Sequence, residues 1–137
     1  MKKRYYELTA GDDSYMNKFK ATNGIRTILL NNKKIKGLVG DNIFPLIAKE
    51  GTVGDFIIYQ RDSYEKEYTK MGICEEKCNV HIDIVSDDYD RSQELACLVN
   101  ETLEGEFNNP KIVVKLLDST EDFSDGKYIQ VLLFSIE

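Results

Sequence analysis

The sequence predicts a single α+β domain in which a mostly antiparallel four-stranded sheet packs with two helices, in the order α-β-β-α-β-β. Three observations lead to this fold class. Apolar and polar residues alternate between residues 77 and 85, an amphipathic segment follows between residues 88 and 104, and two strand-like runs close the chain. At 137 residues the chain has the size of one ordinary domain, so we treat residues 1–137 as one unit.

The N-terminal third is expected to supply the first helix. Residues 1–20 mix basic and aromatic residues without a clear period, and we interpret them as an N-terminal arm or a short strand. A helix is predicted over residues 22–30, because its apolar positions fall mostly on one face although Gly24 interrupts them. Asn31-Asn32 can end that helix, and residues 33–38 add one further turn before Gly40.

The second helix is predicted from Asp88 to Glu104, after the N-cap cluster Ser86-Asp87-Asp88 and before Gly105. It should pack on the sheet, with Ile82 and Leu98 in the core. Between the strands, residues 61–72 suit an exposed hairpin or long loop, and the acidic loop DSTEDFSDGK turns at Asp125-Gly126. The four strands are predicted near residues 56–61, 77–85, 111–117 and 128–136.

Charge is distributed unevenly along the chain. Residues 1–36 carry nine Lys and Arg against three acids, a net charge of +6, whereas residues 37–137 carry nine against twenty-one, a net charge of −12. An acidic majority argues against sequence-specific binding to nucleic acid, because such affinity depends mostly on cations that neutralise phosphates. No run approaches the roughly 18 apolar residues of a membrane span, and no signal peptide is recognisable, so we expect no membrane partner and a cytosolic chain with reduced thiols.

Two glycines in GLVGDNIFP raise the possibility of a phosphate-binding loop. A Walker-type loop needs G-x-x-x-x-G-K-[ST], and a dinucleotide site needs G-x-G-x-x-G between a strand and a helix. Gly37-x-x-Gly40 has neither pattern, and it follows a helical segment instead of preceding one. We therefore expect no nucleotide and no other cofactor.

A zinc site is the next hypothesis, because Cys74, Cys78, His81 and Cys97 are all potential ligands. In one extended strand, four residues separate Cys74 from Cys78 by about 13 Å, which is too far to share an ion. We expect Cys78 and Cys97 to lie on core-facing positions as small hydrophobes, and no metal to be bound.

An enzyme could in principle use His81 as general base with Asp83 on the same face of a strand. The sequence offers no G-x-S-x-G serine for this histidine, and Asp88-x-Asp90-x-Ser92 lacks the following glycine of a calcium loop. No catalytic residue is therefore assigned.

Four segments in order resemble the tail-completion or tail-terminator proteins of long-tailed phages and prophages. They are ILLNNKKIKGLVGDNIFP, then FIIYQRDS, then NVHIDIVS, then a helix that ends LEG, and together they span about residues 22–105. That family often has a proline where this chain has Asp55, and an aromatic residue where it has Val85. The resemblance implies that Gly40 serves the backbone of a structural connection, which Ile43 and Phe44 anchor to the core.

The resemblance further implies a structural virion protein that ends the tail tube and forms the tail side of the head-tail junction. It would act without catalysis as a ring, commonly of six copies, in contact with the tail tube protein and a head-completion or neck protein. It would assemble in the host bacterial cytoplasm and finish in the virion tail. The alternatives are a neck or head-completion protein, a small hydrolase or metal enzyme that uses His81 and Asp83, and a bacterial ligand-binding domain.

A head-to-tail ring would join the basic N-terminal region of one copy to an acidic region of the next, while the remaining acids face the channel. Residues 61–72 are expected to reach a neighbouring copy or the tail tube, because tyrosines on a polar loop are otherwise unexplained and tyrosine is enriched in interface cores. The predicted interface residues are Arg61, Asp62, Tyr64, Tyr68 and Lys70.

Overall fold

The protein is built on one six-stranded mixed sheet with the strand order β1-β2-β3-β6-β5-β4. The computed structural model describes residues 18–68, 70, 72, 74–108 and 111–137. Strand β1 runs parallel to β2, and every other pair of neighbours is antiparallel. The strands are β1 (Ile43–Pro45), β2 (Phe56–Tyr68), β3 (Cys74–Ser86), β4 (Gly105–Asn108), β5 (Lys111–Ser124) and β6 (Lys127–Ile136).

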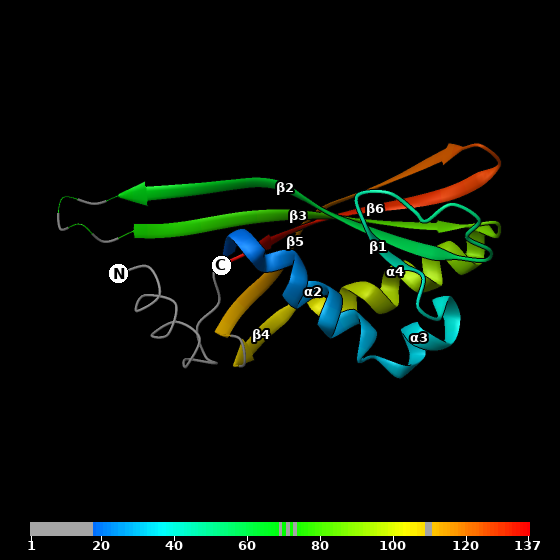
Figure 1. Cartoon of the computed structure of the whole chain (residues 1–137), viewed down its shortest axis with the longest axis horizontal. Helices are drawn as coiled ribbons and strands as arrows, with labels where there is room; N and C mark the ends of the chain where they lie inside the picture. Colours follow the sequence, from blue (N-terminus) through cyan, green and yellow to red (C-terminus); the bar gives the residue numbers. More distant parts are fainter. Residues whose placement is uncertain (1–17, 69, 71, 73, 109–110) are drawn as a thin grey trace.

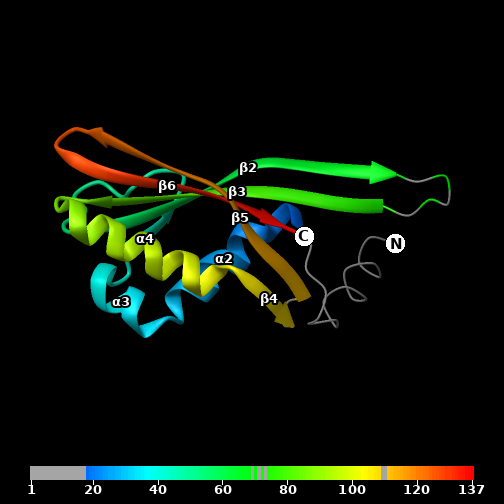
Figure 2. The same ribbon diagram turned by 180° about the vertical axis from the view of Figure 1, so that it is seen from behind.

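The helices gather on one face of this sheet. A short 3₁₀ turn, η1 (Lys18–Lys20), leads into α2 (Ala21–Leu30), and α3 (Lys33–Val39) and α4 (Tyr89–Leu103) complete the layer. Figures 1 and 2 show the three α-helices on the same side of β2, β3 and β6, with α4 packed against β3 and β6. Within the described residues, no helix is both long and apolar enough to cross a membrane. The opposite face of the sheet carries no helix in this part of the chain.

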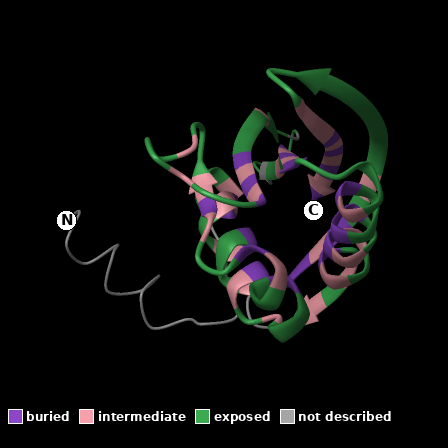
Figure 3. Ribbon diagram, turned by 90° about the vertical axis from the view of Figure 1, so that its right-hand side faces the viewer, coloured by how far each residue is buried: buried purple, intermediate pink, exposed green. Residues whose placement is uncertain are grey.

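The core lies between the helix layer and the sheet, where buried segments of both face each other (Figure 3). Alternation in the strands decides which side chains enter it, because successive residues of a strand point to opposite faces. In β3 the alternate residues Cys78, Val80, Ile82 and Ile84 are all buried. Helix α4 contributes its own buried stripe, which consists of Leu95, Ala96, Val99 and Leu103.

The predicted fold class is wrong in its element count. In the described residues the sheet has six strands instead of four, and three α-helices lie on one of its faces instead of two. The added strands β1 and β4 are only three and four residues long, too short for a two-residue period to identify. The added helix is α3, which we expected as one further turn. It is a separate helix because the Asn32 side chain accepts hydrogen bonds from the backbone N–H groups of Lys34 and Ile35, both at 3.0 Å, and so begins a new helix.

The predicted helices at residues 22–30 and 88–104 are confirmed as α2 and α4, and the strand at residues 77–85 is confirmed within β3. The N-terminal segment that we interpreted as an arm or short strand covers residues 1–20. Residues 1–17 lie outside the described residues, and residues 18–20 form η1. The turn at Asp125-Gly126 is confirmed, since both residues have positive φ, as a type I′ hairpin turn requires. Gly40 has φ of 61° at the end of α3, which explains a glycine there.

Two β-bulges curl the sheet and set where two strands leave the core. The register shifts between Arg61 and Ser63 in β2, and again between Leu116 and Asp118 in β5. A bulge bends its strand and increases the twist. Beyond each bulge the strand carries no buried residue. The acidic stretch that we interpreted as a loop therefore continues as strand, and residues 61–68 extend β2.

One charged pair joins the start of β2 to the start of α4. The Arg91 guanidinium donates from Nε to Asp55 Oδ2 at 2.8 Å and from Nη2 to Oδ1 at 3.0 Å. The side chain of Asp55 is 5% exposed and that of Arg91 is 43% exposed. Burial by itself raises the pKa of Asp55, but hydrogen bonds from Arg91 and Ser86 and the nearby positive charges outweigh it, so the pKa lies below its ordinary value.

Substitution of Ile82 by alanine is expected to lower the free energy of unfolding by roughly 2–5 kcal/mol, because its side chain is fully buried in the central strand. Leu98 is only partly buried, so we expect Leu98→Ala to cost clearly less than Ile82→Ala. Chemical denaturation of the two variants measures the difference. Equal losses would contradict the placement of Leu98 at the edge of the core.

Asp55→Asn is expected to lower the melting temperature at pH 7, because it removes a carboxylate that pairs with Arg91 in the folded chain. A depressed carboxyl pKa stabilises the fold above the unfolded value of about 3.9, and this contribution disappears as the pH falls through the folded value. The gap between wild type and variant should therefore narrow below about pH 4. Melting curves from pH 3 to pH 7 are the test, and a gap that is constant with pH would contradict it.

Candidate interaction surfaces

The most prominent feature outside the core is a two-stranded arm, which we define as residues 61–77. Residues 65–68 pair with residues 74–77. At the base of the arm, residues 61–64 pair with residues 78–80, and β6 pairs with β3 only from Cys78 onward. Residues 74–77 therefore have a strand neighbour on one side only. Figure 1 shows the arm projecting well beyond the helices. The sequence predicted an exposed hairpin or loop here, and the hairpin is confirmed, with Thr69, Met71 and Ile73 outside the described residues.

The base of the arm is fixed to the start of the described chain. The Arg61 guanidinium lies 3.9 Å from the centre of the Phe19 ring, and its Nη1 donates to the Phe19 carbonyl oxygen at 3.0 Å. The Tyr64 ring meets Phe19 edge-on with centroids 5.1 Å apart, and its hydroxyl donates to Glu76 Oε2 at 2.8 Å. Arg61 and Tyr64, two of the predicted interface residues, thus fix the base of the arm to η1.

The other predicted interface residues lie along the arm. Asp62 sits at the bulge and pairs with His81, with Oδ1 and Nε2 3.3 Å apart. Tyr68 is 73% exposed near the tip, and Lys70 is exposed beyond it. The five predicted residues share one element, but only Tyr68 and Lys70 stand at its outer end.

Two segments of opposite charge lie apart on the surface. Within the described residues 18–36 there are six Lys and Arg and no acid, and most of these cations are exposed on η1, α2 and α3. Residues 118–125 contain four acids, Asp118, Glu121, Asp122 and Asp125, and no Lys or Arg, and every residue in that stretch is exposed. We call these the basic segment and the acidic segment. The acidic segment lies at the end of the sheet away from the arm (Figure 1).

The geometry around His81 does not favour the hydrolase hypothesis. His81 and Asp83 lie on the same face of β3, but the histidine pairs with Asp62. Burial raises the pKa of Asp83, and the charge of His81 acts in the opposite direction. Within the described residues no group of three or more His, Cys, Asp or Glu side chains is arranged to hold a metal ion.

The cysteines differ from one another in their surroundings. Cys78 is buried and free, as expected, and burial raises the pKa of its thiol. Cys97 is exposed on α4, so the prediction that it faces the core is wrong. Its Sγ lies 3.5 Å from Glu101 Oε1, and the hydrogen bond to this carboxylate raises the pKa of the thiol. The error arose because the buried stripe of α4 passes through Leu95 and Val99.

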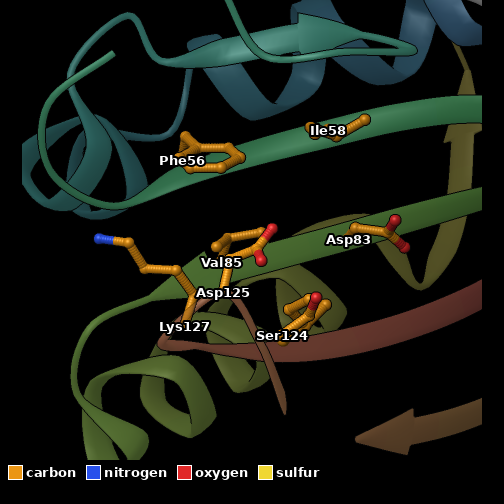
Figure 4. A pocket seen from close by; sticks show the side chains of 8 residues that line it. Phe56, Ile58, Asp83, Val85, Ser124, Asp125 and Lys127 are labelled. Carbon is orange, nitrogen blue, oxygen red and sulfur yellow. The ribbon is translucent and has the colours of Figure 1, made fainter. Parts of the chain in front are cut away.

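A groove of about 360 Å³ opens on the face of the sheet that carries no helix, and we call it the outer groove. Figure 4 shows Phe56 and Ile58 on β2, Asp83 and Val85 on β3, and Lys127 at the start of β6 around it. This surface was not predicted from the sequence. A signal was present, because FIIY and the VLLF of β6 are apolar at every position, a pattern typical of strands that are covered on both faces. The groove is lined by Phe56, Ile58, Asp83, Val85, Ser124, Asp125, Lys127 and Ile129.

Comparison with known proteins gives a relationship of fold. No family model matches the chain, and no curated protein matches it. Among solved structures, a chain of one described as "Virion of native gene transfer agent (GTA) particle" superposes with a TM-score of 0.70 at 14% sequence identity. The match covers 82% of this chain and 89% of that chain. At this identity the likeness establishes a shared fold over nearly the whole of both chains.

We predict that the protein purified without chelator carries no stoichiometric zinc or other transition metal, because neither the cysteines nor His81 complete a ligand set in the described structure. Elemental analysis is the measurement, and one metal ion per chain would contradict it.

The substitution His81→Ala should leave assembly unchanged, because the His81 side chain pairs only with Asp62 on the surface among the ion pairs of the described residues.

Proposed function

We propose that this protein is a structural component of a phage-like virion that ends the tail tube and forms the tail side of the head-tail junction. The observation that carries the proposal is the shared fold with a chain of a gene transfer agent virion over 82% of this sequence. The ordered resemblance of residues 22–105 to tail-completion proteins supports the same role. The protein acts by occupying a surface, so no catalytic residue is assigned.

The arm provides the contact that such a protein needs. A protein that stops a growing tube must bind the last ring of tube subunits or its own neighbours through an element that extends beyond its body. The arm has this shape, and its base is fixed by Phe19, Arg61 and Tyr64, so its direction is set before binding. The described strands of the arm are already paired, so they lose little conformational entropy when they dock.

The separation of charge supports a head-to-tail ring, of six copies by resemblance. The basic segment of one copy and the acidic segment of the next attract, whereas two like segments repel. Unlike surfaces that meet in the same way at every contact form a heterologous interface, which closes into a ring when the rotation between copies allows it. Acids that remain outside this contact line the channel and repel DNA as it passes.

A neck or head-completion role is the alternative within the same class, and it differs in partner. Such a protein would bind the portal side and leave isolated tail tubes free. Binding to tubes formed by the tail tube protein of the same phage or prophage distinguishes the two roles.

Shortening the arm is expected to abolish tube capping without unfolding the protein. Replacement of residues 65–77 by Asn-Gly joins Tyr64 to Cys78, which are paired in the sheet, through a type I′ turn. The change removes Glu76, the partner of the Tyr64 hydroxyl, but it keeps Arg61, Tyr64 and Cys78, so the core and the contacts with Phe19 should be preserved. Negative-stain microscopy of tubes mixed with each protein measures capping, and thermal unfolding measures the fold.

A shortened chain that still stops tubes at the normal length would exclude the arm from this role. Binding of the full-length chain to a portal complex, without binding to tubes, would favour the neck role.

The full-length chain at increasing salt concentration tests the charge contact in the ring. If the basic and acidic segments meet in the ring, rings should weaken as ionic strength rises, because salt screens exposed charges.

A further inference from the structure

At the end of the sheet beside the acidic segment, the outer face carries a cluster of apolar side chains, and the described chain leaves it without a covering layer. Phe56 and Ile58 in β2, Val85 in β3, and Ile129 in β6 all point to this face, opposite the helices. Val85 is only 7% exposed, and the other three are intermediate in exposure. Because these partly exposed apolar side chains line a groove, the groove is a candidate binding site for another protein.

One polar atom, Oδ1 of Asp83, determines which side chains the outer groove can bind well. Asp83 lies among these apolar side chains, and its Oδ1 is buried without a hydrogen-bond partner in the described structure. Lys127 stands at the rim, but its ammonium group pairs with Asp87. A buried carboxylate oxygen without a donor carries a desolvation cost that a cationic side chain can remove. The groove therefore fits an apolar or aromatic side chain next to a lysine or arginine.

The tip of the arm has this combination. Tyr68 is 73% exposed, and the exposed Lys70 follows two positions later. The base residues Arg61 and Tyr64 are engaged with Phe19, so they are not available for such a contact. A tyrosine supplies a rigid ring with a polar end, which suits a groove with apolar walls and an open mouth.

We propose that the outer groove of one copy receives the arm tip of a second copy, with the Tyr68 ring on the apolar walls and the Lys70 ammonium at Asp83. The tip and the groove lie toward opposite ends of the sheet, so one chain presents the tip while the other presents the groove (Figure 1). Such a contact is heterologous and repeats from copy to copy. The inference rests on the proposed ring, and it assigns to that ring a specific contact.

The groove also adjoins the acidic segment, because Ser124 and Asp125 belong to its lining. The arm base likewise adjoins the basic segment through Phe19, which lies in η1. Docking of the arm therefore brings Lys18 and Lys20 of η1 in one copy toward the acidic segment of the next copy. The charge pattern and the apolar groove select the same partner, a second copy of this chain.

Charge exchange between Lys70 and Asp83 tests this contact in the full-length protein. Lys70→Asp and Asp83→Lys should each weaken self-association by about tenfold or more, and the double variant should recover most of the loss, because close charge pairs across interfaces are coupled. Sedimentation velocity measures association, with and without tail tubes. Lys111→Asp makes the same change at an exposed lysine at the start of β5 and should have little effect.

Asp83 is half-buried, so unfolding of Asp83→Lys must be distinguished from loss of the contact. Lys70 is exposed on the arm tip, and Lys70→Asp should melt as wild type does. Asp83→Asn provides a milder variant that removes the charge and keeps the size. Single variants that associate as tightly as wild type, or a wild-type chain that does not associate even on tubes, would overturn the proposal.

A photocrosslink identifies the receiving surface directly. Tyr68 is replaced by p-benzoylphenylalanine, and light and heavy isotope-labelled copies are mixed so that links between copies can be recognised by mass spectrometry. The expected links join position 68 to residues 56–58, 83–85 or 127–129 of another copy. Links from capped tubes to the tube protein alone would overturn the docking and leave the proposed function standing. Links to the groove in a protein that does not cap tubes would support the docking and count against the function.

Discussion

The structure depends on the two-sided pairing of β3. This strand hydrogen-bonds to β2 along one edge and to β6 along the other, and its alternate side chains Val80, Ile82 and Ile84 form the floor of the core. Helix α4 follows β3 directly and packs back on it and on β6. The pair between Asp55 and Arg91 ties the entry of β2 to the same helix. A register slip in β3 would turn the buried set outward, so this one alternation fixes both faces of the molecule.

The two bulges divide the sheet into a part that folds the chain and parts that remain available for contact. Before the bulge, β2 and β5 bury alternate residues, and after it they bury none. Beyond the bulges, β2 and β5 continue as strands because they still pair with β3 and β6, and not because their side chains enter the core. An extended strand edge is prone to unwanted pairing, and charged side chains on the acidic segment limit it. The arm and the acidic segment therefore arise in the same way, because each is the part of a strand that continues beyond a β-bulge.

The sequence predicted the elements with a clear period and missed those without one. Helix α4 and strand β3 are long and strongly patterned, so they were predicted to within a few residues. Strands β1 and β4 exist because neighbouring strands present edges to them, which no local pattern reveals. The five predicted interface residues fall on one arm, but their separation into base and tip depends on Phe19, more than 40 positions from Arg61 and Tyr64. The outer groove combines β2, β3 and the turn into β6, so tertiary structure alone brings it together.

Charge and apolar burial would have different tasks in a ring of this chain. Exposed cations on the basic segment and acids on the acidic segment would act over a distance of about a Debye length, so they would orient two copies as they approach. They contribute little to the final affinity, because exposed pairs are weak. A groove with apolar walls and one unpaired carboxylate oxygen supplies the short-range part. Closure into a ring then requires a fixed angle between copies, which a flexible loop could not hold. The arm can hold it, because its twist is set at the bulge and its base is packed on Phe19.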